Sequence, residues 1–234
     1  MDIAGSVAFV TGANRGLGAA FCRKLLEQGA AKVYAGARNP DSVRAPGVIP
    51  VRLDVTSATD VAEAAALCAD STLLINNAGI TSAGSVLSPD ALERGRREFE
   101  TNVFGTLATA SAFAPALKAN GGGGILNVLS VLSWVSLPGS GLYCASKAAA
   151  WSLTNALRLE LVAQGTHVMA LHVGYMDTDM TAGVTAPKSS PDNVAELALT
   201  GFGSGAFEVL ADEISHRVRG ALSVSLPTLY PALG

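Results

Sequence analysis

Hydrophobic residues occur along this chain in short runs, separated by longer stretches with a helical period. The first run, residues 7–10, is Val-Ala-Phe-Val, which is typical of a strand buried in a parallel sheet. Similar runs follow at 32–36, 48–53, 73–76, 125–129, 167–172 and 207–210, and helical patterns lie near 16–28, 58–69, 89–118, 143–164, 191–200 and 212–222. Strands that alternate with helices predict an α/β fold with a doubly wound, mainly parallel seven-stranded sheet and helices on both faces.

Composition narrows the class of protein. A length of 234 residues suits one α/β domain, so we expect 1–234 to form a single domain with a C-terminal tail, 223–234, of unassigned role. Although 49% of the residues are hydrophobic, no apolar run approaches the roughly 18 residues needed to span a membrane. Because the first strand is expected almost at the start of the sequence, we expect no signal peptide. A net charge of −3 does not indicate nucleic acid or a membrane surface as a partner.

The three cysteines, Cys22, Cys68 and Cys144, show neither metal-ligand nor disulfide spacing. This pattern is typical of a reducing compartment and predicts a cytoplasmic protein with buried thiols and no metal. His167, His172 and His216 share no spacing, and we expect them to be structural or exposed.

A glycine-rich turn, Thr-Gly-Ala-Asn-Arg-Gly-Leu-Gly at residues 11–18, joins the first strand to the first helix. Gly12 permits a tight turn, Gly16 lets a pyrophosphate approach the backbone, and Gly18 lets the helix pack closely on the strand. The helix N-terminus offers free N–H groups and a partial positive charge to the phosphates. The stretch predicts a Rossmann-type dinucleotide site, with an ordinary strand–turn–helix as the alternative reading of this motif alone.

Tyr143 and Lys147 lie four residues apart in a helical pattern, thirteen residues after Ser130. Residues four apart share a helix face, so the phenol and the ammonium can point into one cleft. At about 4 Å and an effective dielectric of about 20, their attraction of roughly 4 kcal/mol would lower the phenol pKa from about 10 towards about 7. Such a tyrosine can transfer a proton at neutral pH. Without other motifs, a tyrosine and a lysine at this spacing are more often a packed aromatic ring beside a solvent-exposed amine.

Together these motifs resemble the short-chain dehydrogenase/reductase family in its single-domain form. The spacing Gly-x-x-x-Gly-x-Gly is typical of that family, and the resemblance extends from residue 7 to about residue 212. It also rests on Asp54-Val55, Asn76-Asn77-Ala78-Gly79, Asn102 and the stretch 173–178. Two departures are Leu-Ser-Val-Leu-Ser at 129–133, where the family commonly has Ser-Ser-x-x-Gly, and Val173-Gly174 in place of Pro-Gly.

The resemblance implies a role for each of four catalytic residues. Tyr143 would be the general acid that protonates a carbonyl oxygen as hydride arrives from a nicotinamide. Lys147 would lower the pKa of Tyr143 and bind the nicotinamide ribose, and Ser130 would fix the carbonyl oxygen. Asn102 would hold a water that links Lys147 to solvent.

Charge at the end of the second strand predicts the cofactor. NAD-binding sites usually carry an acid there, whereas residues 35–39 are Ala-Gly-Ala-Arg-Asn. Arg38 and Arg15 could converge on a 2′-phosphate, which predicts NADP(H), although a merely solvated Arg38 is the alternative. Together with the contacts that the resemblance implies, the predicted cofactor contacts are Gly12, Asn14, Arg15, Gly16, Leu17, Gly18, Arg38, Asp54, Val55, Asn77, Ala78, Gly79, Tyr143, Lys147, Gly174, Met176 and Thr178.

The resemblance implies that residues after Ser130 and after Gly174 form the wall of the substrate pocket. Here these residues are apolar and aromatic: Leu132, Trp134, Leu137, Tyr175 and Met180. Because the set holds no Arg or Lys, we expect a neutral, largely apolar ketone or aldehyde. The combined prediction is an NADPH-dependent carbonyl reductase. Two alternatives are an alcohol dehydrogenase working oxidatively with NAD(P) and, from another class, a non-catalytic dinucleotide sensor.

Two further expectations concern the surface. The charged run 93–98 is expected to be a solvated helix face. Helices near 99–118 and 143–164 carry more apolar surface than one sheet face can cover, and in the resembled family they form a two-fold interface, so a homodimer or homotetramer is predicted. The residues concerned are Phe99, Val103, Phe104, Leu107, Ala110 and Phe113, with Ala148 to Leu153, Ala156 and Leu157.

Overall fold

A computed structural model describes residues 2–230 and 233 of the chain. Its centre is a seven-stranded sheet in the order β3-β2-β1-β4-β5-β6-β7, with every neighbouring pair parallel. The strands are β1 (Val7–Thr11), β2 (Lys32–Ala37), β3 (Ile49–Arg52), β4 (Leu73–Asn76), β5 (Gly124–Val128), β6 (His167–His172) and β7 (Glu208–Leu210). The predicted doubly wound fold is confirmed. Strand order reverses between β1 and β4, the place where such sheets open a cleft at their carboxyl ends.

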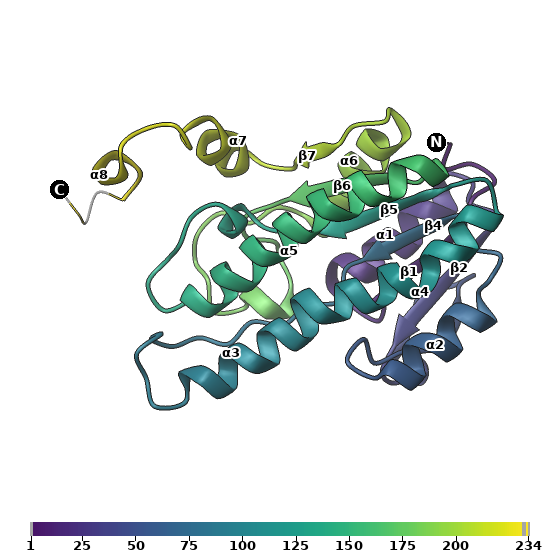
Figure 1. Cartoon of the computed structure of the whole chain (residues 1–234), viewed down its shortest axis with the longest axis horizontal. Helices are drawn as coiled ribbons and strands as arrows, with labels where there is room; N and C mark the ends of the chain where they lie inside the picture. Colours follow the sequence, from purple (N-terminus) through teal and green to yellow (C-terminus); the bar gives the residue numbers. More distant parts are fainter. Residues whose placement is uncertain (1, 231–232, 234) are drawn as a thin grey trace.

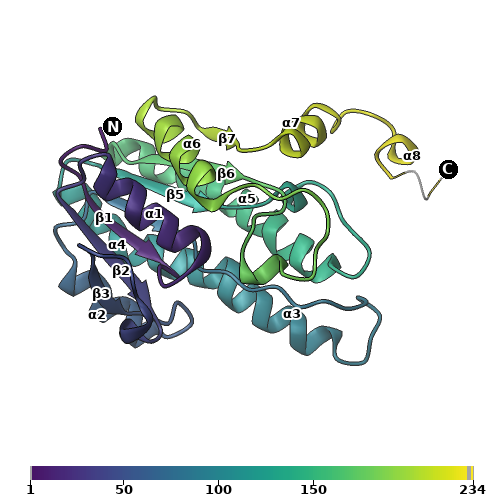
Figure 2. The same cartoon turned by 180° about the vertical axis from the view of Figure 1, so that it is seen from behind.

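Helices cover both faces of the sheet. α1 (Gly16–Glu27) and α6 (Pro191–Gly203) lie on one face (Figure 2), and α2 (Ala58–Leu67), α4 (Gly105–Ala119) and α5 (Gly141–Leu161) on the other (Figure 1). The remaining helices are α3 (Ala91–Phe99), α7 (Glu213–Gly220) and α8 (Leu226–Leu229), with short helical turns at Pro40–Ser42, Glu100–Phe104, Val131–Ser133, Val162–Gln164 and Asp179–Thr181. No helix in the described part of the chain is long and apolar enough to cross a membrane.

Two cores result from the alternation of side chains along the strands. Beneath α1 and α6, Val10 packs with Phe21 and Phe202. On the opposite face, Phe9 packs with Phe113 of α4, with ring centroids 4.7 Å apart. All five of these apolar side chains are fully buried. Cys22, Cys68 and Cys144 are buried and unpaired, as the sequence predicts.

The helix expected over 89–118 is interrupted. α3 ends at Phe99, a π-helical turn follows at Glu100–Phe104, and α4 begins at Gly105. A π turn widens the backbone hydrogen-bond ladder by one residue and often occurs at functional sites. Here it carries Asn102, one of the predicted catalytic residues.

The expectation that 93–98 is a solvated face is wrong for two of its residues. Arg94 is 5% exposed and Glu98 is 1% exposed. The Arg94 guanidinium donates to the Ser85 carbonyl at 2.7 Å, and Glu98 Oε1 accepts from the Ser82 N–H at 2.6 Å. The stretch 80–90 therefore returns over α3 and covers these charges, which charge spacing in the helix alone does not reveal.

Several apolar residues expected at a subunit interface belong to the protomer's own core. Val103 of the π turn, Ala110 and Phe113 of α4, and Leu157 of α5 are buried. On α4 and the π turn, Phe104 and Leu107 stay exposed, at 52% and 38%.

A buried chain of polar side chains crosses the centre of the sheet. Asn76 and Asn127 occupy paired positions on β4 and β5, and Asn76 Nδ2 donates to Asn127 Oδ1 at 2.9 Å. Thr109 of α4 donates to Asn76 Oδ1 at 2.7 Å, while Asn127 Nδ2 donates to Thr154 Oγ1 of α5 at 3.0 Å. All four are at most 5% exposed. These hydrogen bonds fix α4 and α5 relative to the sheet.

We expect Thr154→Val to lower the free energy of unfolding by about 1–3 kcal/mol, because it keeps the shape of the side chain but leaves the buried Asn127 amide without its acceptor. Urea unfolding measures the change. Thr200→Val, on the exposed face of α6, is the matched control and should change stability by less than about 0.5 kcal/mol. Equal effects at both positions would contradict the assignment.

Candidate active site

The glycine turn is held to the end of β4 by Thr11 and Asn77. Thr11 Oγ1 accepts from the N–H groups of Asn77 and Ala78, at 3.0 and 2.9 Å. In return, Asn77 Nδ2 donates to the carbonyls of Thr11 and Gly12, at 2.9 and 3.1 Å. These bonds bring the turn and residues 77–79 together at the point where strand order reverses.

The turn has a shape that side chains would obstruct. Gly12 and Gly16 have φ of 63° and 53°, the left-handed region that favours glycine. A Cβ at Gly18 would overlap the Gly12 carbonyl oxygen and lie 2.6 Å from Asn77 Nδ2. The first turn of α1 thus presents bare backbone, with Leu17 turned into the core, and this arrangement fits the phosphates of a dinucleotide.

Ser130, Tyr143 and Lys147 come together beyond the end of β5. Ser130 follows this strand, and its Oγ accepts from the Leu132 N–H at 3.1 Å. The Ser130 hydroxyl is close enough to the Tyr143 phenol to lower its pKa. Tyr143 and Lys147 are both on α5, with Lys147 Nζ 5.7 Å from the centre of the phenol ring. Nζ donates to the Val128 carbonyl at 2.9 Å.

Asn102 is fixed by its side-chain amide. Its Oδ1 accepts from the Ile80 N–H and its Nδ2 donates to the Ile80 carbonyl, both at 2.9 Å. Nδ2 also donates to Ser146 Oγ at 3.0 Å. Gly79 lies between Asn102 and Lys147, since a Cβ there would be 3.2 Å from Asn102 Oδ1 and 3.7 Å from Lys147 Nζ. Sequence reasoning did not identify Ser146, whose only signal is its place beside Lys147.

Burial is the largest influence on the pKa values of Tyr143 and Lys147, the predicted catalytic pair. Burial raises the pKa of Tyr143 to about 12, against a smaller lowering by the Ser130 hydrogen bond. Burial also lowers the pKa of Lys147 from 10.5 to about 8. The expectation of a Tyr143 pKa near 7 is therefore wrong for this structure. The reason is that Lys147 points its ammonium at a backbone carbonyl and is itself only 5% exposed, so its charge is disfavoured.

Arg15 and Arg38, which are expected to converge on a 2′-phosphate, have different neighbours in the structure. Arg15 pairs with Asp179 at 3.1 Å, and both side chains are exposed. Arg38 is exposed at the end of β2, where its charge helps lower the pKa of Asp54, after the larger effect of the Thr56 backbone hydrogen bond. Sequence spacing could not reveal that Arg15 pairs with Asp179.

The loop after β6 reaches back to the glycine turn. A Cβ at Gly16 would lie 3.2 Å from the Thr178 methyl group, so these residues are in contact range. The Gly174 N–H donates to Asp212 Oδ2 at 2.6 Å, which ties the loop to the N-terminus of α7. Met176 forms a bridge with Ser189 across the loop.

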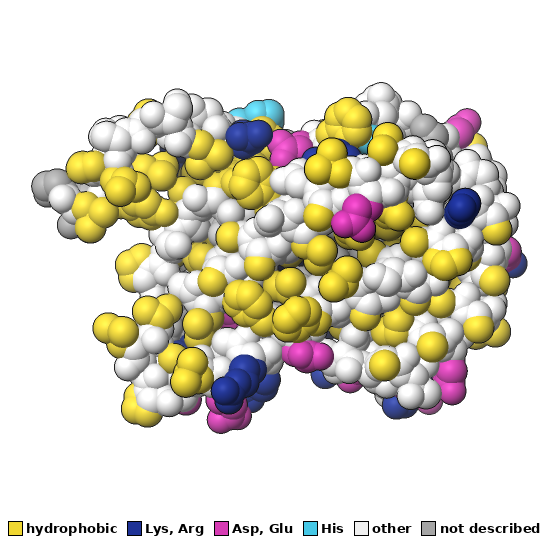
Figure 3. All heavy atoms as spheres, in the orientation of Figure 1, with side chains coloured by type: hydrophobic (Ala, Val, Ile, Leu, Met, Phe, Trp, Pro, Cys, Tyr) yellow, Lys and Arg dark blue, Asp and Glu magenta, His cyan; other side chains and the backbone are white. Residues whose placement is uncertain are grey.

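The predicted pocket residues lie partly open to solvent. Figure 3 shows a notch in the surface between the C-terminal arm, which carries α7 and α8, and the end of the molecule formed by α3. Leu132 and Trp134 are partly buried, whereas Leu137, Tyr175 and Met180 are 40%, 38% and 50% exposed. The arm is tied to this region because the Ser136 N–H donates to the Tyr230 hydroxyl at 3.1 Å.

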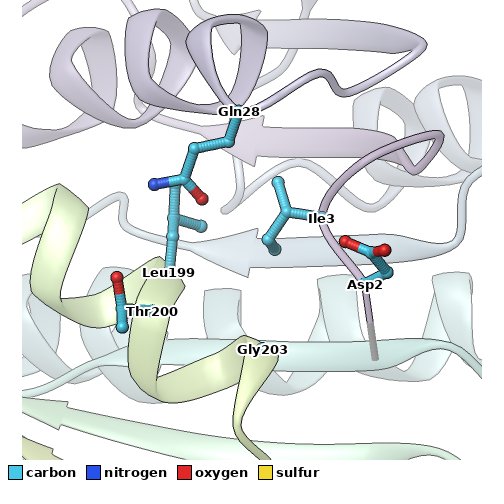
Figure 4. A pocket seen from close by; sticks show the side chains of 6 residues that line it. All are labelled: Asp2, Ile3, Gln28, Leu199, Thr200 and Gly203. Atoms are coloured by element: carbon cyan, nitrogen blue, oxygen red, sulfur yellow. The ribbon is translucent and has the colours of Figure 1, made fainter.

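A separate cavity of about 470 Å³ lies at the opposite, amino-terminal edge of the sheet (Figure 4). It is lined by Asp2, Ile3, Gln28, Leu199, Thr200 and Gly203, from the N-terminal segment and the last turns of α1 and α6. One ionisable side chain, that of Asp2, is in this set, and none of the predicted site residues is. The catalytic candidates all lie at the carboxyl edge.

Comparison with known proteins agrees with this geometry. Residues 6–189 match the short chain dehydrogenase family, and the chain belongs to that family. It is accordingly an oxidoreductase that acts on alcohol or carbonyl substrates.

Individual relatives cover most of the chain. A short chain dehydrogenase from Burkholderia cenocepacia J2315, solved in complex with NADP, is similar with a TM-score of 0.94 and 42% identity, over 100% of this chain and 99% of that chain. A cis-4-hydroxycyclohexanecarboxylate dehydrogenase of Sinomonas cyclohexanicum is 34% identical over 231 residues, 92% of this chain and 93% of the relative. A 2,5-dichloro-2,5-cyclohexadiene-1,4-diol dehydrogenase of Sphingobium indicum is 33% identical over 195 residues, 78% of this chain and 77% of the relative.

We expect Lys147→Met to stabilise the free protein at neutral pH while abolishing catalysis. A pKa of about 8 in the folded chain, against 10.5 when unfolded, corresponds to roughly 3 kcal/mol of destabilisation at neutral pH. Losing the bond to Val128 offsets part of the gain, so urea unfolding should show an increase of about 1–3 kcal/mol.

The sign of the effect gives a pH signature. The unfolded chain binds the extra proton between pH 8 and 10.5, so the destabilisation by Lys147 is complete below about 8 and fades as the pH rises to 10.5. The advantage of the Met variant should therefore shrink over that range. Lys118→Met, at an exposed lysine near the end of α4, is the control and should show no such trend.

Proposed function

We propose that the protein is an NADPH-dependent carbonyl reductase, with Tyr143 as the general acid for a neutral, largely apolar ketone or aldehyde. The observation that carries the proposal is the grouping of Ser130, Tyr143 and Lys147 at the carboxyl edge of the sheet, where Lys147 Nζ lies 5.7 Å from the centre of the phenol ring and Ser130 is close enough to lower the Tyr143 pKa. These groups lie beyond the same sheet edge as the glycine turn. Acid and cofactor site therefore share one cleft.

Each residue has a distinct task in this reaction. NADPH, when bound, supplies the hydride. The Tyr143 hydroxyl donates a proton to the carbonyl oxygen, and a pKa of about 12 keeps that proton in place at neutral pH. Ser130 donates a second hydrogen bond to the same oxygen and stabilises its developing charge. Lys147, within one helical turn of Tyr143, supplies positive charge and a contact for the nicotinamide ribose.

The preference for NADP(H) rests on charge. The end of β2 carries Arg38 and no acid, and Arg15 stands in the glycine turn. Guanidinium groups bind phosphate through directed hydrogen bonds. A relative with 42% identity over the whole chain has been solved with NADP, which supports the same choice here.

We expect Arg38→Ala to weaken NADPH binding by roughly 10- to 150-fold, since a hydrogen bond to a charged group contributes about 1.5–3 kcal/mol. NADH lacks the 2′-phosphate, so its affinity should hardly change. Fluorescence titration of both cofactors gives the two dissociation constants. Arg44→Ala, at an exposed arginine after β2, is the control, and equal losses for NADPH and NADH at position 38 would argue against the assignment.

The proposed substrate class follows from the apolar pocket residues. Burial of apolar ligand surface contributes about 25 cal/mol per Å². A second candidate is oxidation of a ring alcohol, because two relatives of this chain are named as dehydrogenases of hydroxylated six-membered carbocycles. One of those named substrates carries a carboxylate, so charged and neutral ketones need to be compared directly.

The decisive experiment is a panel of neutral ketones, aldehydes and keto acids with NADPH, and of the matching alcohols with NADP⁺. We expect neutral carbonyl compounds to turn over best. Tyr143→Phe should bind NADPH normally and lose about 10²- to 10⁴-fold in kcat, because it lacks the acid. Better turnover of keto acids would overturn the pocket assignment, and normal kcat in the Phe variant would overturn the role of Tyr143.

We also propose that two or four copies of this chain assemble through α4 and α5. Figure 3 shows apolar side chains gathered on the face where these helices lie. Exposed Phe104, Leu107, Leu159 and Val162 contribute to this face, and exposed Ala148 permits close helix approach. The buried free thiols fit a reducing compartment such as the cytoplasm.

A further inference from the structure

Among the described residues, the His172 side chain makes one hydrogen bond, and it is with the backbone of Ser130, the proposed catalytic serine. The residue ends β6 and is completely buried. Its Nδ1 lies 3.1 Å from the Ser130 carbonyl oxygen. A carbonyl oxygen can only accept a hydrogen bond, so Nδ1 must carry the proton.

The other ring nitrogen has no hydrogen-bond partner in the part of the chain that the structure describes. Nε2 is buried without a hydrogen bond and lies 3.8 Å from Glu208 Oε1. That carboxylate is already used: Oε1 accepts from Trp151 Nε1 at 3.0 Å, and Oε2 accepts from Arg219 at 3.3 Å. Burial lowers the pKa of His172 to about 4, so at neutral pH the ring is uncharged and Nε2 holds a lone pair.

The hydrogen bond from His172 supports a stretch of backbone that has just left the sheet. The β5–β6 ladder continues past the end of β5, where the N–H groups of Leu129 and Val131 donate to the carbonyls of Leu171 and Val173 at 2.8 and 3.0 Å. Between them, the Ser130 carbonyl accepts from the Ser133 N–H at 3.0 Å and from His172. The imidazole thus supplies the one side-chain donor to this carbonyl among the described residues.

The face of the same ring supports the substrate wall. The imidazole stacks on the indole of Trp134, with centroids 3.8 Å apart and an interplanar angle of 19°. Trp134 in turn meets Trp151 edge to face at 6.2 Å, and Arg219 of α7 lies 5.5 Å from its ring. One side chain therefore contacts both the catalytic serine and the expected pocket wall.

We propose that His172 is a positioning residue: its Nδ1–H sets the backbone of Ser130, and its ring face sets the indole of Trp134. The first contact aims the Ser130 hydroxyl at the carbonyl oxygen and should govern kcat. The second contact shapes the pocket and should govern KM for bulky substrates. The inference rests on the proposed carbonyl reduction.

Two substitutions of similar shape separate these effects. In His172→Asn, the Nδ2 atom is as many bonds from Cα as Nδ1 and can keep the donor, whereas His172→Leu has no donor. Both variants lose the stacked ring, so KM for a bulky ketone should rise in both. We expect kcat to fall by about 10- to 100-fold in the Leu variant, because small misplacement of a catalytic group is costly, and by less than about threefold in the Asn variant.

His167→Asn and His167→Leu are the matched controls. His167 lies at the other end of β6 and contacts the Ala206 carbonyl at 2.9 Å. These two variants should have the same kcat. Circular dichroism and NADPH affinity must match the wild type in every variant, which separates misplacement of Ser130 from loss of the fold.

Nitrogen NMR of the histidine rings tests the contact without any substrate. The chain has three histidines, so the signals of His172 can be assigned by substitution. We expect a protonated Nδ1 and an unprotonated Nε2 throughout the neutral range. A proton on Nε2, or equal kcat in the Asn and Leu variants of His172, would overturn the proposal. If the wild type reduced no carbonyl compound, the proposed function would fail, while the ring signals would still decide whether His172 donates to Ser130.

Discussion

The buried amide pair Asn76–Asn127 is the constraint on which the geometry of the cleft depends. Each amide lies in the middle of the sheet and needs partners, which Thr109 and Thr154 provide from two different helices. An unpaired polar group at such a place costs roughly 1–3 kcal/mol, so β4, β5, α4 and α5 must all adopt one register together. Apolar packing alone would allow the helices to slide by small amounts. The directed bonds do not.

Because of this fixed register, residues far apart in sequence meet at the carboxyl edge. α5 carries Tyr143 and Lys147 upstream of Thr154, and the π turn that holds Asn102 runs directly into α4. Thr11 and Asn77 attach the glycine turn to the same edge. The proposed catalytic groups therefore lie on elements whose relative positions are set by buried hydrogen bonds, which is how a site achieves accuracy without many contacts of its own.

The fold could be predicted from sequence because its signals are local. Apolar runs mark strands buried on both faces. Three glycines mark the turn: positions 12 and 16 have a positive φ that favours glycine, and position 18 has no room for a side chain. The grouping of Ser130, Tyr143 and Lys147 could be predicted from the family resemblance, and their spatial proximity agrees with it.

Other features depend on contacts that the sequence does not encode locally. The pKa of Tyr143 is set by burial more than by its charged neighbour, and burial results from the whole fold. The charges of Arg94 and Glu98 are covered by a loop that precedes them, and Ser146 and His172 gain significance only through partners 44 and 42 residues away in sequence. Periodicity shows which face of an element is buried and not what lies against it.

The exposed Arg15–Asp179 pair has a consequence for how an anion enters the cleft. It joins the glycine turn to the loop after β6, and ion pairs at exposed positions contribute only about 0–1 kcal/mol. A contact that weak opens and closes freely, so in the proposed cofactor site Arg15 would be shared between the Asp179 carboxylate and the phosphate of the ligand. Dissolved salt then acts in two opposite directions on association: it reduces the long-range attraction of an anionic ligand and loosens the internal competitor. The ionic strength of the solution would therefore affect how readily an anionic ligand binds at the proposed site beside the glycine turn.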